Sequence, residues 1–502
     1  MSERFALSLR TAKNALFGLT AFGYSAALAV VITPILVHGL GSVYYGIFAL
    51  SAAALGFVGM LDLGMGTALV RFLSSAVAHG EVEEPRRLVQ ASAAFYSIVG
   101  VAGFVIMLLL GLFFAPALFH LGPHDLAIAR FALIVSGGAF AFDTVARTFN
   151  SIPLALQRSG VAATVRIASG TAGAVVAAAI VEAGLGLRWL VAGYAVLDVA
   201  GLFVALAVAR RILPGVRLRP RWDPDRVRRL MTFSGWVFLA NISAFVIFQF
   251  DRLMLGALAS VSAVTYYAVP SSMASYIYAA TTSLAAIVIP ATGDLIARGE
   301  RVPVERLYRR ATRLCLLFVA SLGIPVMVFA HPLLELWLDP RFASKSSLTL
   351  QLLILTFVFF SLTIIPYNML VAGGLPRIVG VLNLCIAALN VALIFVLIPP
   401  YGATGAAVAY LVSVLLFPLF IWYAETRVLQ LRRPQWLSTI WRVLPALGVQ
   451  AAACLVVRLL APSAWVELAA TALAVPVPAL VYFFSGLIDP DERAIFRELA
   501  RR

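Results

Sequence analysis

Long runs of apolar residues recur along the whole chain, separated by short segments that carry Gly, Pro or charge. The hydrocarbon core of a bilayer is about 30 Å thick, so a helix of about 20 residues crosses it. Barrel strands would be shorter and would alternate apolar with polar residues. The pattern therefore predicts an all-α polytopic membrane protein with about fourteen transmembrane helices. These fall at residues 15–37, 46–70, 89–117, 127–149, 161–183, 189–209, 232–256, 264–291, 312–334, 347–371, 379–399, 404–423, 438–460 and 465–486.

Composition and the placement of charge agree with this pattern. Hydrophobic residues make up 62% of the chain and charged residues 12%, whereas a soluble domain carries roughly 25% charge. The net charge is +15, but the arginines lie in short loops on alternate sides of the apolar runs, so nucleic-acid binding is not expected. By the positive-inside rule both termini face the cytoplasm, and we expect a bacterial inner (cytoplasmic) membrane. The basic segment Arg210–Arg229 lies on the same side, where it would attract anionic membrane lipids.

The second half of the chain echoes the first. Leu40-Gly41-Ser42-Val43 corresponds to Leu258-Ala259-Ser260-Val261 at an offset of about 218 residues, and further short matches share that offset. Equivalent points are six predicted spans apart, so both halves insert the same way up, as a parallel repeat. The predicted parts are an N-lobe at 1–209, a basic cytoplasmic linker at 210–230, a C-lobe at 231–425, and spans 13–14 with a cytoplasmic tail at 426–502.

No sequence motif indicates catalysis or a bound cofactor. The five histidines and three cysteines form no metal-ligand pattern, and the chain has no Walker loop. The loops on the outer side are too short for a folded external domain. The sequence therefore predicts a protein that is not an enzyme and that needs no cofactor or metal.

Charged residues inside the predicted spans are the first candidates for function, because each costs about 2.5–3.5 kcal/mol at the centre of a helix. Asp198 in the sixth span is either an ion-coupling site facing a cavity or a buried acid bonded to a neighbouring helix. Asp251 and Arg252 in the seventh span point about 100° apart, so they cannot both face one site. We take Asp251 as a candidate for ion coupling and Arg252 as a candidate for substrate binding.

A second group of charges lies in spans four and five. Asp143 and Arg147 share one helix face, where they could form a structural ion pair or, through Asp143, an ion-coupling site. Arg147, Arg158 and Arg166 lie near the cytoplasmic ends of these spans. Arginine matches phosphate oxygens in charge and geometry, so Arg147 and Arg166 are predicted to bind a pyrophosphate. Arg158 is explained as well by the ordinary positive charge of cytoplasmic loops.

Uncharged polar residues inside the spans would line a hydrophilic cavity for sugars. The substrate-binding candidates Asn241 and Asn390 belong to this set, together with Gln249. Single amides also commonly link neighbouring helices, so this alternative stays open. Asp62 is predicted to be structural, because the adjacent Gly64 lets helices approach closely.

Short segments spread over nearly the whole chain resemble one family. They occur in the order and spacing of polysaccharide lipid flippases of the Wzx type, which belong to the multidrug, oligosaccharidyl-lipid and polysaccharide exporter superfamily. The segments are Thr33-Pro34, Leu61-Asp62-Leu63-Gly64, Phe250-Asp251-Arg252, His331-Pro332-Leu333-Leu334-Glu335-Leu336-Trp337 and Tyr401-Gly402-Ala403-Thr404-Gly405.

This resemblance implies a fold, a substrate and partners. The fold would be two six-helix lobes around a central, partly cationic cavity. The function would be to flip an undecaprenyl-diphosphate-linked oligosaccharide from the cytoplasmic to the outer leaflet by alternating access, for O-antigen, capsule or exopolysaccharide synthesis. Partners would be the lipid-linked oligosaccharide itself and the polysaccharide polymerase and glycosyltransferases of the same synthesis.

Three other functions remain open. A cation-coupled drug exporter of the superfamily would have acids in its cavity, whereas an anionic substrate calls for arginine; two spans beyond twelve argue against the exporter. A lipid II flippase would carry cationic residues within the first span, but Arg10 and Lys13 precede that span. A membrane polysaccharide polymerase or ligase would need a large external loop, which the short outer loops do not provide.

Overall fold

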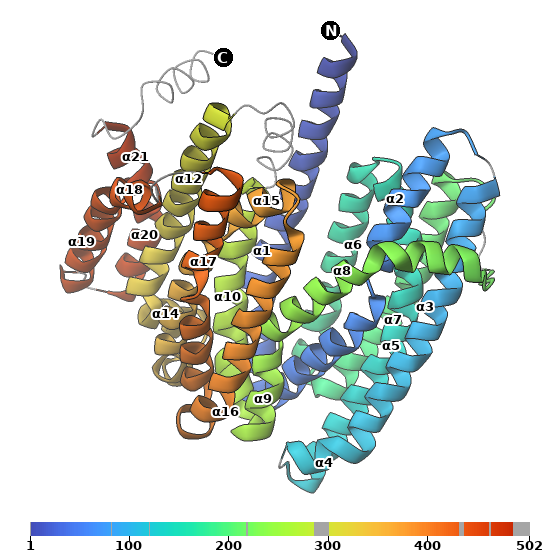
Figure 1. Cartoon of the computed structure of the whole chain (residues 1–502). Helices are drawn as coiled ribbons and strands as arrows, with labels where there is room; N and C mark the ends of the chain where they lie inside the picture. The colour runs from blue at the N-terminus through green and yellow to red at the C-terminus, as the bar shows by residue number, and fades with distance from the viewer. Residues whose placement is uncertain are drawn as a thin grey trace. The chain divides into compact units, whose positions relative to one another are not determined.

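The computed structural model describes residues 2–81, 83–119, 121–216, 219–285, 301–430, 436–460 and 463–484, as helices and short connections with no strand within these ranges (Figure 1). The chain divides into two compact units, Met1–Ala268 (unit 1) and Val269–Arg502 (unit 2). The predicted all-α fold class is confirmed.

Nine helices within the described residues are long and apolar enough to cross a membrane. Two of these stretches, Thr20–Asp62 and Arg377–Val428, have 43 and 52 residues, more than the about 20 that one crossing needs. Each contains a glycine with a left-handed φ, Gly41 (φ 77°) or Gly402 (φ 54°), where the sequence predicts a loop between two spans. The count of fourteen spans therefore stays a prediction.

Unit 1 is built from helices α1 to α9, with a 3-10 turn after α1 and a π-helical turn after α3. Helix α10 (Val261–Ala285) crosses the boundary between the units. The elements of unit 1 are α1 (Ser2–Gly59), η1 (Met60–Asp62), α2 (Met65–Ala78), α3 (Glu83–Leu109), η2 (Leu110–Phe114), α4 (Ala115–Leu118), α5 (Pro123–Ala155), α6 (Ser159–Glu182), α7 (Gly186–Ile212), α8 (Pro224–Phe248) and α9 (Phe250–Leu258).

Unit 2 contains the remaining helices, several of them broken by a short turn. They are α12 (Arg301–Val328), α13 (Ala330–Trp337), α14 (Pro340–Ser361), α15 (Ile364–Ala372), α16 (Pro376–Val414), α17 (Phe417–Tyr423), η3 (Ala424–Val428), α18 (Trp436–Trp441), α19 (Leu444–Leu460), α20 (Ala464–Ala474) and α21 (Val477–Phe484).

Local sequence explains where the helices begin and how closely they pack. Asp223 precedes Pro224 and accepts a hydrogen bond from the backbone N–H of Arg226 at 3.2 Å, which caps α8. Two glycines bring α3 against α5: a Cβ at Gly103 would lie 2.5 Å from a Phe140 ring carbon, and one at Gly100 would lie 2.9 Å from the backbone of α5. Without side chains there, the two backbones approach closely, which fixes α5.

The seventh predicted span, 232–256, differs from the structure. The helix begins earlier, at Pro224, because of the Asp223 cap, and it breaks at Gln249 (φ −132°) before continuing as α9. Neither α8 nor α9 is among the nine candidate spans found within the described residues.

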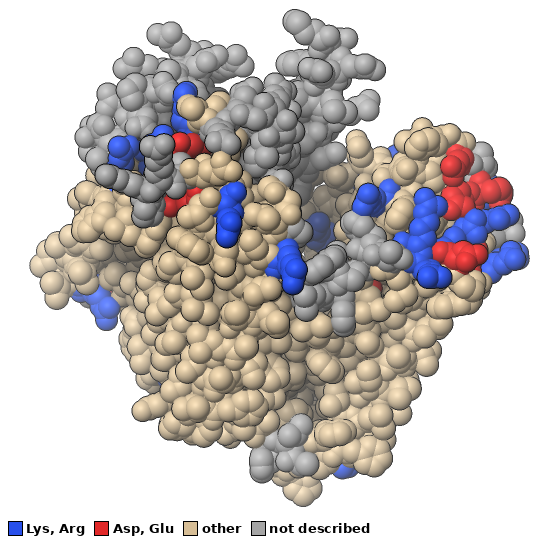
Figure 2. Space-filling model, viewed as in Figure 1, with Lys and Arg blue, Asp and Glu red and all other residues tan. Residues whose placement is uncertain are grey.

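The predicted linker is ordered where it is described. The backbone N–H of Arg221 donates to the Gln90 carbonyl at 3.3 Å, and Arg226 forms an ion pair with Glu84 at 2.7 Å. Charged side chains gather over this end of unit 1, where α2, α3 and the start of α8 lie (Figure 2). The described linker residues thus belong to unit 1. The lobe bounds 1–209 and 231–425, and the separate part 426–502, stay predictions.

Candidate functional site

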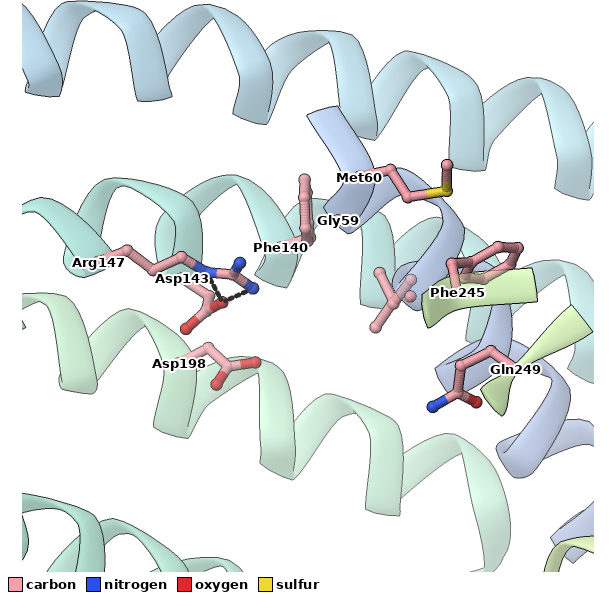
Figure 3. Close-up of a pocket in the computed structure, with 10 residues that line it drawn as sticks. Gly59, Met60, Phe140, Asp143, Arg147, Asp198, Phe245 and Gln249 are labelled. Carbon is pink, nitrogen blue, oxygen red and sulfur yellow. Dashed lines mark hydrogen bonds and ion pairs between the residues drawn. The ribbon is translucent and has the colours of Figure 1, made fainter. Parts of the chain in front are cut away.

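A polar cavity of about 650 Å³ lies within unit 1 (Figure 3). Its volume falls in the range of about 300–1,000 Å³ that small-molecule sites occupy. Side chains from α1, α5, α7 and α8, with the turn that follows α1 and the residue that follows α8, form its wall. The lining residues are Leu55, Gly56, Gly59, Met60, Phe140, Asp143, Arg147, Asp198, Phe245 and Gln249.

Asp143 and Arg147 face the cavity from α5 as an ion pair. Both Nε and Nη2 of Arg147 donate to Oδ2 of Asp143, at 3.0 and 2.9 Å. The two side chains are 42% and 39% exposed, so the cavity is accessible to water at this point. The structural ion pair considered from the sequence thus forms, and the charge of Arg147 is already matched within its own helix.

Asp198 brings a second carboxylate to the cavity from α7. Figure 3 shows its carboxylate facing the Asp143–Arg147 pair. In the part of the chain that the structure describes, Asp198 makes no hydrogen bond and no ion pair. The lining therefore holds two carboxylates against one guanidinium, a formal charge of −1. This cavity does not match the partly cationic cavity that the resemblance implies.

Gln249 supplies a polar group at the break between α8 and α9. Its side-chain oxygen Oε1 is buried and accepts no hydrogen bond from any described residue. Two aromatic rings complete the wall: Phe245 packs on Phe57 with centroids 5.6 Å apart, and Phe140 lies 5.8 Å from the Arg147 guanidinium carbon. The sequence names Gln249 among the polar residues that would line a hydrophilic cavity, but the helix break that places it here is not evident from the pattern.

Asp62 lies beside the cavity in the turn between α1 and α2. Tyr96 of α3, fully buried, donates a hydrogen bond to Asp62. The turn continues through Leu63 and Gly64, both with left-handed backbones (φ 51° and 77°), and Leu63 is strained there because it carries a Cβ. Asp62 does not line the cavity, which supports the structural role predicted for it.

Asp251 is enclosed, unlike the cavity acids. It is 1% exposed at the start of α9 and accepts a hydrogen bond from Tyr267 of α10. Arg252 follows it, half-buried, with its backbone N–H bonded to the Gln249 carbonyl at 3.2 Å. Asp251 is thus more enclosed than Arg252, and the roles predicted for the two residues stay predictions.

The three arginines predicted to lie close together do not line one cavity. Arg147 lines the cavity described above, whereas Arg158 lines a second cavity of about 790 Å³ and Arg166 is exposed on α6 and lines neither. The cause is the turn between Ala155 and Ser159, which separates Arg147 from the two others along the chain. Arg147 and Arg166 therefore do not line one cavity among the described residues, and their binding of a pyrophosphate stays a prediction.

Asn390, one of the two asparagine candidates, is enclosed. Asn390 is 0% exposed within α16 of unit 2, which agrees better with a link between helices than with a cavity lining. The side chain of Asn241 lies outside the described residues. Within those residues no cluster of three or more His, Cys, Asp or Glu side chains could hold a metal ion.

The fold is that of multi-pass membrane transporters. The structure superimposes on the inward closed conformation of the lipid II flippase MurJ with a TM-score of 0.73 and 13% identity. The match covers 94% of this chain and 100% of the MurJ chain. The structure also superimposes on an inward-facing multidrug resistance MATE family transporter of the MOP superfamily, over 82% and 95% of the two chains, with a TM-score of 0.67 and 14% identity.

Sequence comparison then defines the family. The family model described as "Polysaccharide biosynthesis protein" matches residues 11–295, more than half of the chain, and the MatE model matches residues 237–396. The chain belongs to the polysaccharide biosynthesis protein family. The resemblance to the exporter superfamily drawn from the sequence is confirmed.

Curated relatives are distant but match over most of their length. A Shigella flexneri protein named "Putative O-antigen transporter" is 21% identical, over 83% of this chain and 98% of its own. A Bacillus subtilis protein, "Uncharacterized membrane protein EpsK", is 21% identical over 96% and 97% of the two chains.

Proposed function

We propose that this protein flips an undecaprenyl-diphosphate-linked oligosaccharide from the cytoplasmic to the outer leaflet by alternating access, for O-antigen, capsule or exopolysaccharide synthesis. The polar, water-accessible cavity of unit 1, set among apolar helices, is the observation that carries this proposal. A sugar head group cannot cross hydrocarbon unaided, because each hydroxyl would lose its hydrogen bonds to water. A cavity with hydrogen-bonding groups replaces those bonds while the polyprenyl chain stays in lipid.

The family and the relatives support the same proposal. A relative named as an O-antigen transporter and a fold neighbour that is a lipid II flippase both act, by their names, on glycan-bearing substrates. We place the protein in the bacterial inner membrane with both termini in the cytoplasm, as the positive-inside pattern predicts. Its partners would be anionic membrane lipids and the polymerase and glycosyltransferases of the same synthesis, and no nucleic acid.

We assign ion coupling first to Asp251. Its carboxylate is enclosed and held by Tyr267, so a change in its protonation would alter the packing of α9 on α10. Asp143 and Asp198 remain alternative coupling acids. Arg166 and Arg252 remain candidates for the diphosphate, because the charge of Arg147 is matched by Asp143.

A cation-coupled drug exporter is the second candidate, and the acidic lining of the cavity favours it. Reconstitution in vesicles separates the two functions. We expect the protein to expose a glycan-labelled undecaprenyl-diphosphate oligosaccharide to an external glycan-cleaving enzyme faster than vesicles without protein do. Transport of a lipophilic cation, with no flipping above the empty vesicles, would establish the exporter instead.

A further inference from the structure

The lining of the unit 1 cavity holds one more carboxylate than guanidinium groups. Asp143 and Asp198 both belong to it, and within the described residues Asp198 accepts no hydrogen bond. The lining guanidinium, that of Arg147, is bonded to Asp143 through two of its nitrogens. A ligand that donates a hydrogen bond to Asp198 would therefore be favoured, since a hydrogen bond to a charged group is stronger than one between neutral groups.

The shape and walls of the cavity indicate what kind of donor fits. Water takes up about 30 Å³ per molecule in the liquid, so about 650 Å³ holds roughly twenty waters, far more than one ion requires. Phe140 of α5 and Phe245 of α8 also line this cavity (Figure 3). A sugar ring has hydroxyl donors at its edge and apolar C–H groups on its faces, so it satisfies acceptors and aromatic rings together.

The sign of the charge restricts which sugars fit. The lining carries a formal charge of −1, and a further carboxylate, Asp62, lies in the turn just beyond Met60. An anion placed here would face like charges with no free arginine in the lining to offset them. The diphosphate of a lipid-linked substrate would be repelled for the same reason.

We propose that the unit 1 cavity is the glycan subsite, that it accepts neutral or amino sugars, and that it rejects sugars bearing carboxylates. This inference rests on the proposed flippase function and deepens it by naming the substrate class. The hydroxyl or ammonium groups of the glycan donate to Asp198 and Asp143. The diphosphate is bound elsewhere in the chain.

Equilibrium binding to the purified full-length protein tests the subsite without any transport. The probes are tetramers of glucose, glucosamine and glucuronate, at one fixed ionic strength. We expect glucosamine and glucose to bind at least about tenfold more tightly than glucuronate, which corresponds to about 1.4 kcal/mol. Asp198→Asn should reduce this preference by about tenfold, whereas Asp225→Asn, the same change at an exposed position in the first turn of α8, should leave it intact.

Each other outcome overturns the proposal. Tighter or equal binding of the glucuronate tetramer would show that the cavity does not exclude acidic sugars. If neither the glucose tetramer nor the glucosamine tetramer binds, the unit 1 cavity is not a glycan subsite. Tighter binding of a lipophilic cation than of any tetramer would assign the cavity to a cationic ligand.

A flipping assay with lipid-linked glycans distinguishes a failure of this inference from a failure of the proposed function. Two undecaprenyl-diphosphate trisaccharides that differ only in a terminal CH2OH or carboxylate group serve as substrates. The neutral one should flip at least about tenfold faster. If neither flips but the tetramers bind in the expected order, the proposed function fails and the subsite stands. If both flip at one rate, the function stands and the subsite fails.

Discussion

Unit 1 holds two kinds of acid within its helices, and they differ in access. Asp143 and Asp198 line an open cavity, and Asp198 is left without a hydrogen bond or ion pair among the described residues. Asp251 is 1% exposed and bonded by Tyr267. The comparison teaches that depth in the membrane does not by itself identify a ligand-binding acid. A ligand-binding acid is identified by its access to a cavity and by a carboxylate that no other residue matches. An enclosed acid that is hydrogen-bonded to a tyrosine instead holds helices together or responds to protonation.

Filling the cavity should have the largest effect. Gly59 lines it, has a right-handed helical backbone, and a Cβ there would meet nothing within 4 Å. We expect Gly59→Leu to lower the flipping rate at least about tenfold without loss of stability, because the new side chain occupies space the ligand needs and glycine is a weak helix former. The flipping rate in vesicles and the thermal unfolding temperature measure the two effects.

Gly138→Leu is the matched control. Gly138 is helical in α5, and a Cβ there also meets nothing within 4 Å, but it does not line the cavity. Its flipping rate should equal that of the wild type. Equal loss of activity in both variants would mean that the cavity is not the path of the head group.

Neutralising Asp198 and neutralising Asp251 should have different effects on transport. Asp198→Asn removes a charged acceptor, and a hydrogen bond to a charged group contributes about 1.5–3 kcal/mol, so flipping should fall by about tenfold or more. Asp251→Asn should instead change how the rate responds to an imposed proton gradient. Rates measured with and without the gradient distinguish them, and the same response in both variants would remove the distinction drawn here.

Much of the fold follows from the sequence, but the site follows only in part. Apolar runs of about 20 residues predict the helices because lipid offers the backbone no partner. The i, i+4 spacing predicts the Asp143–Arg147 pair. The breaks at Gln249 and at Leu63 do not follow, because neither residue is a usual helix breaker and tertiary contacts stabilise the turns. That Arg147 lines the cavity and Arg166 does not is also not evident from the sequence, because nearness along the chain does not reveal which side chains face one cavity.

The enclosed acid should matter for stability. Tyr267→Phe keeps the ring but removes the donor to the buried Asp251 carboxylate, so we expect a loss of about 1–3 kcal/mol in the free energy of unfolding. Thermal unfolding in detergent measures it. Tyr401→Phe, at a tyrosine that is 65% exposed, should change nothing. A Tyr267→Phe protein as stable as the wild type would show that the hydrogen bond does not secure α9 to α10.

The smallest effect is expected at the start of α8. The backbone hydrogen bond from Arg226, and then the side-chain bond from the same residue, lower the pKa of Asp223 below its usual value of about 4. A lowered folded pKa means that this contribution to stability is present above pH of about 4 and is lost as the pH falls through the folded pKa. The protection factor of the Arg226 amide, its exchange rate relative to the intrinsic rate at the same pH, should therefore fall at acidic pH, and less so in Asp223→Asn, whose cap does not titrate. Identical pH profiles would exclude Asp223 as the titrating cap.

Labelling of a thiol in the cavity tests the central claim most directly, that a glycan head group occupies the unit 1 cavity during transport. In a background without the three native cysteines, Gly59→Cys introduces a thiol into the lining, and Gly138→Cys serves as control. A membrane-impermeant maleimide should label the thiol of Gly59→Cys, and added undecaprenyl-diphosphate oligosaccharide should slow that labelling at least about tenfold while leaving Gly138→Cys unchanged. A Gly59→Cys thiol that is never labelled, or is labelled equally with and without the substrate, would contradict the account.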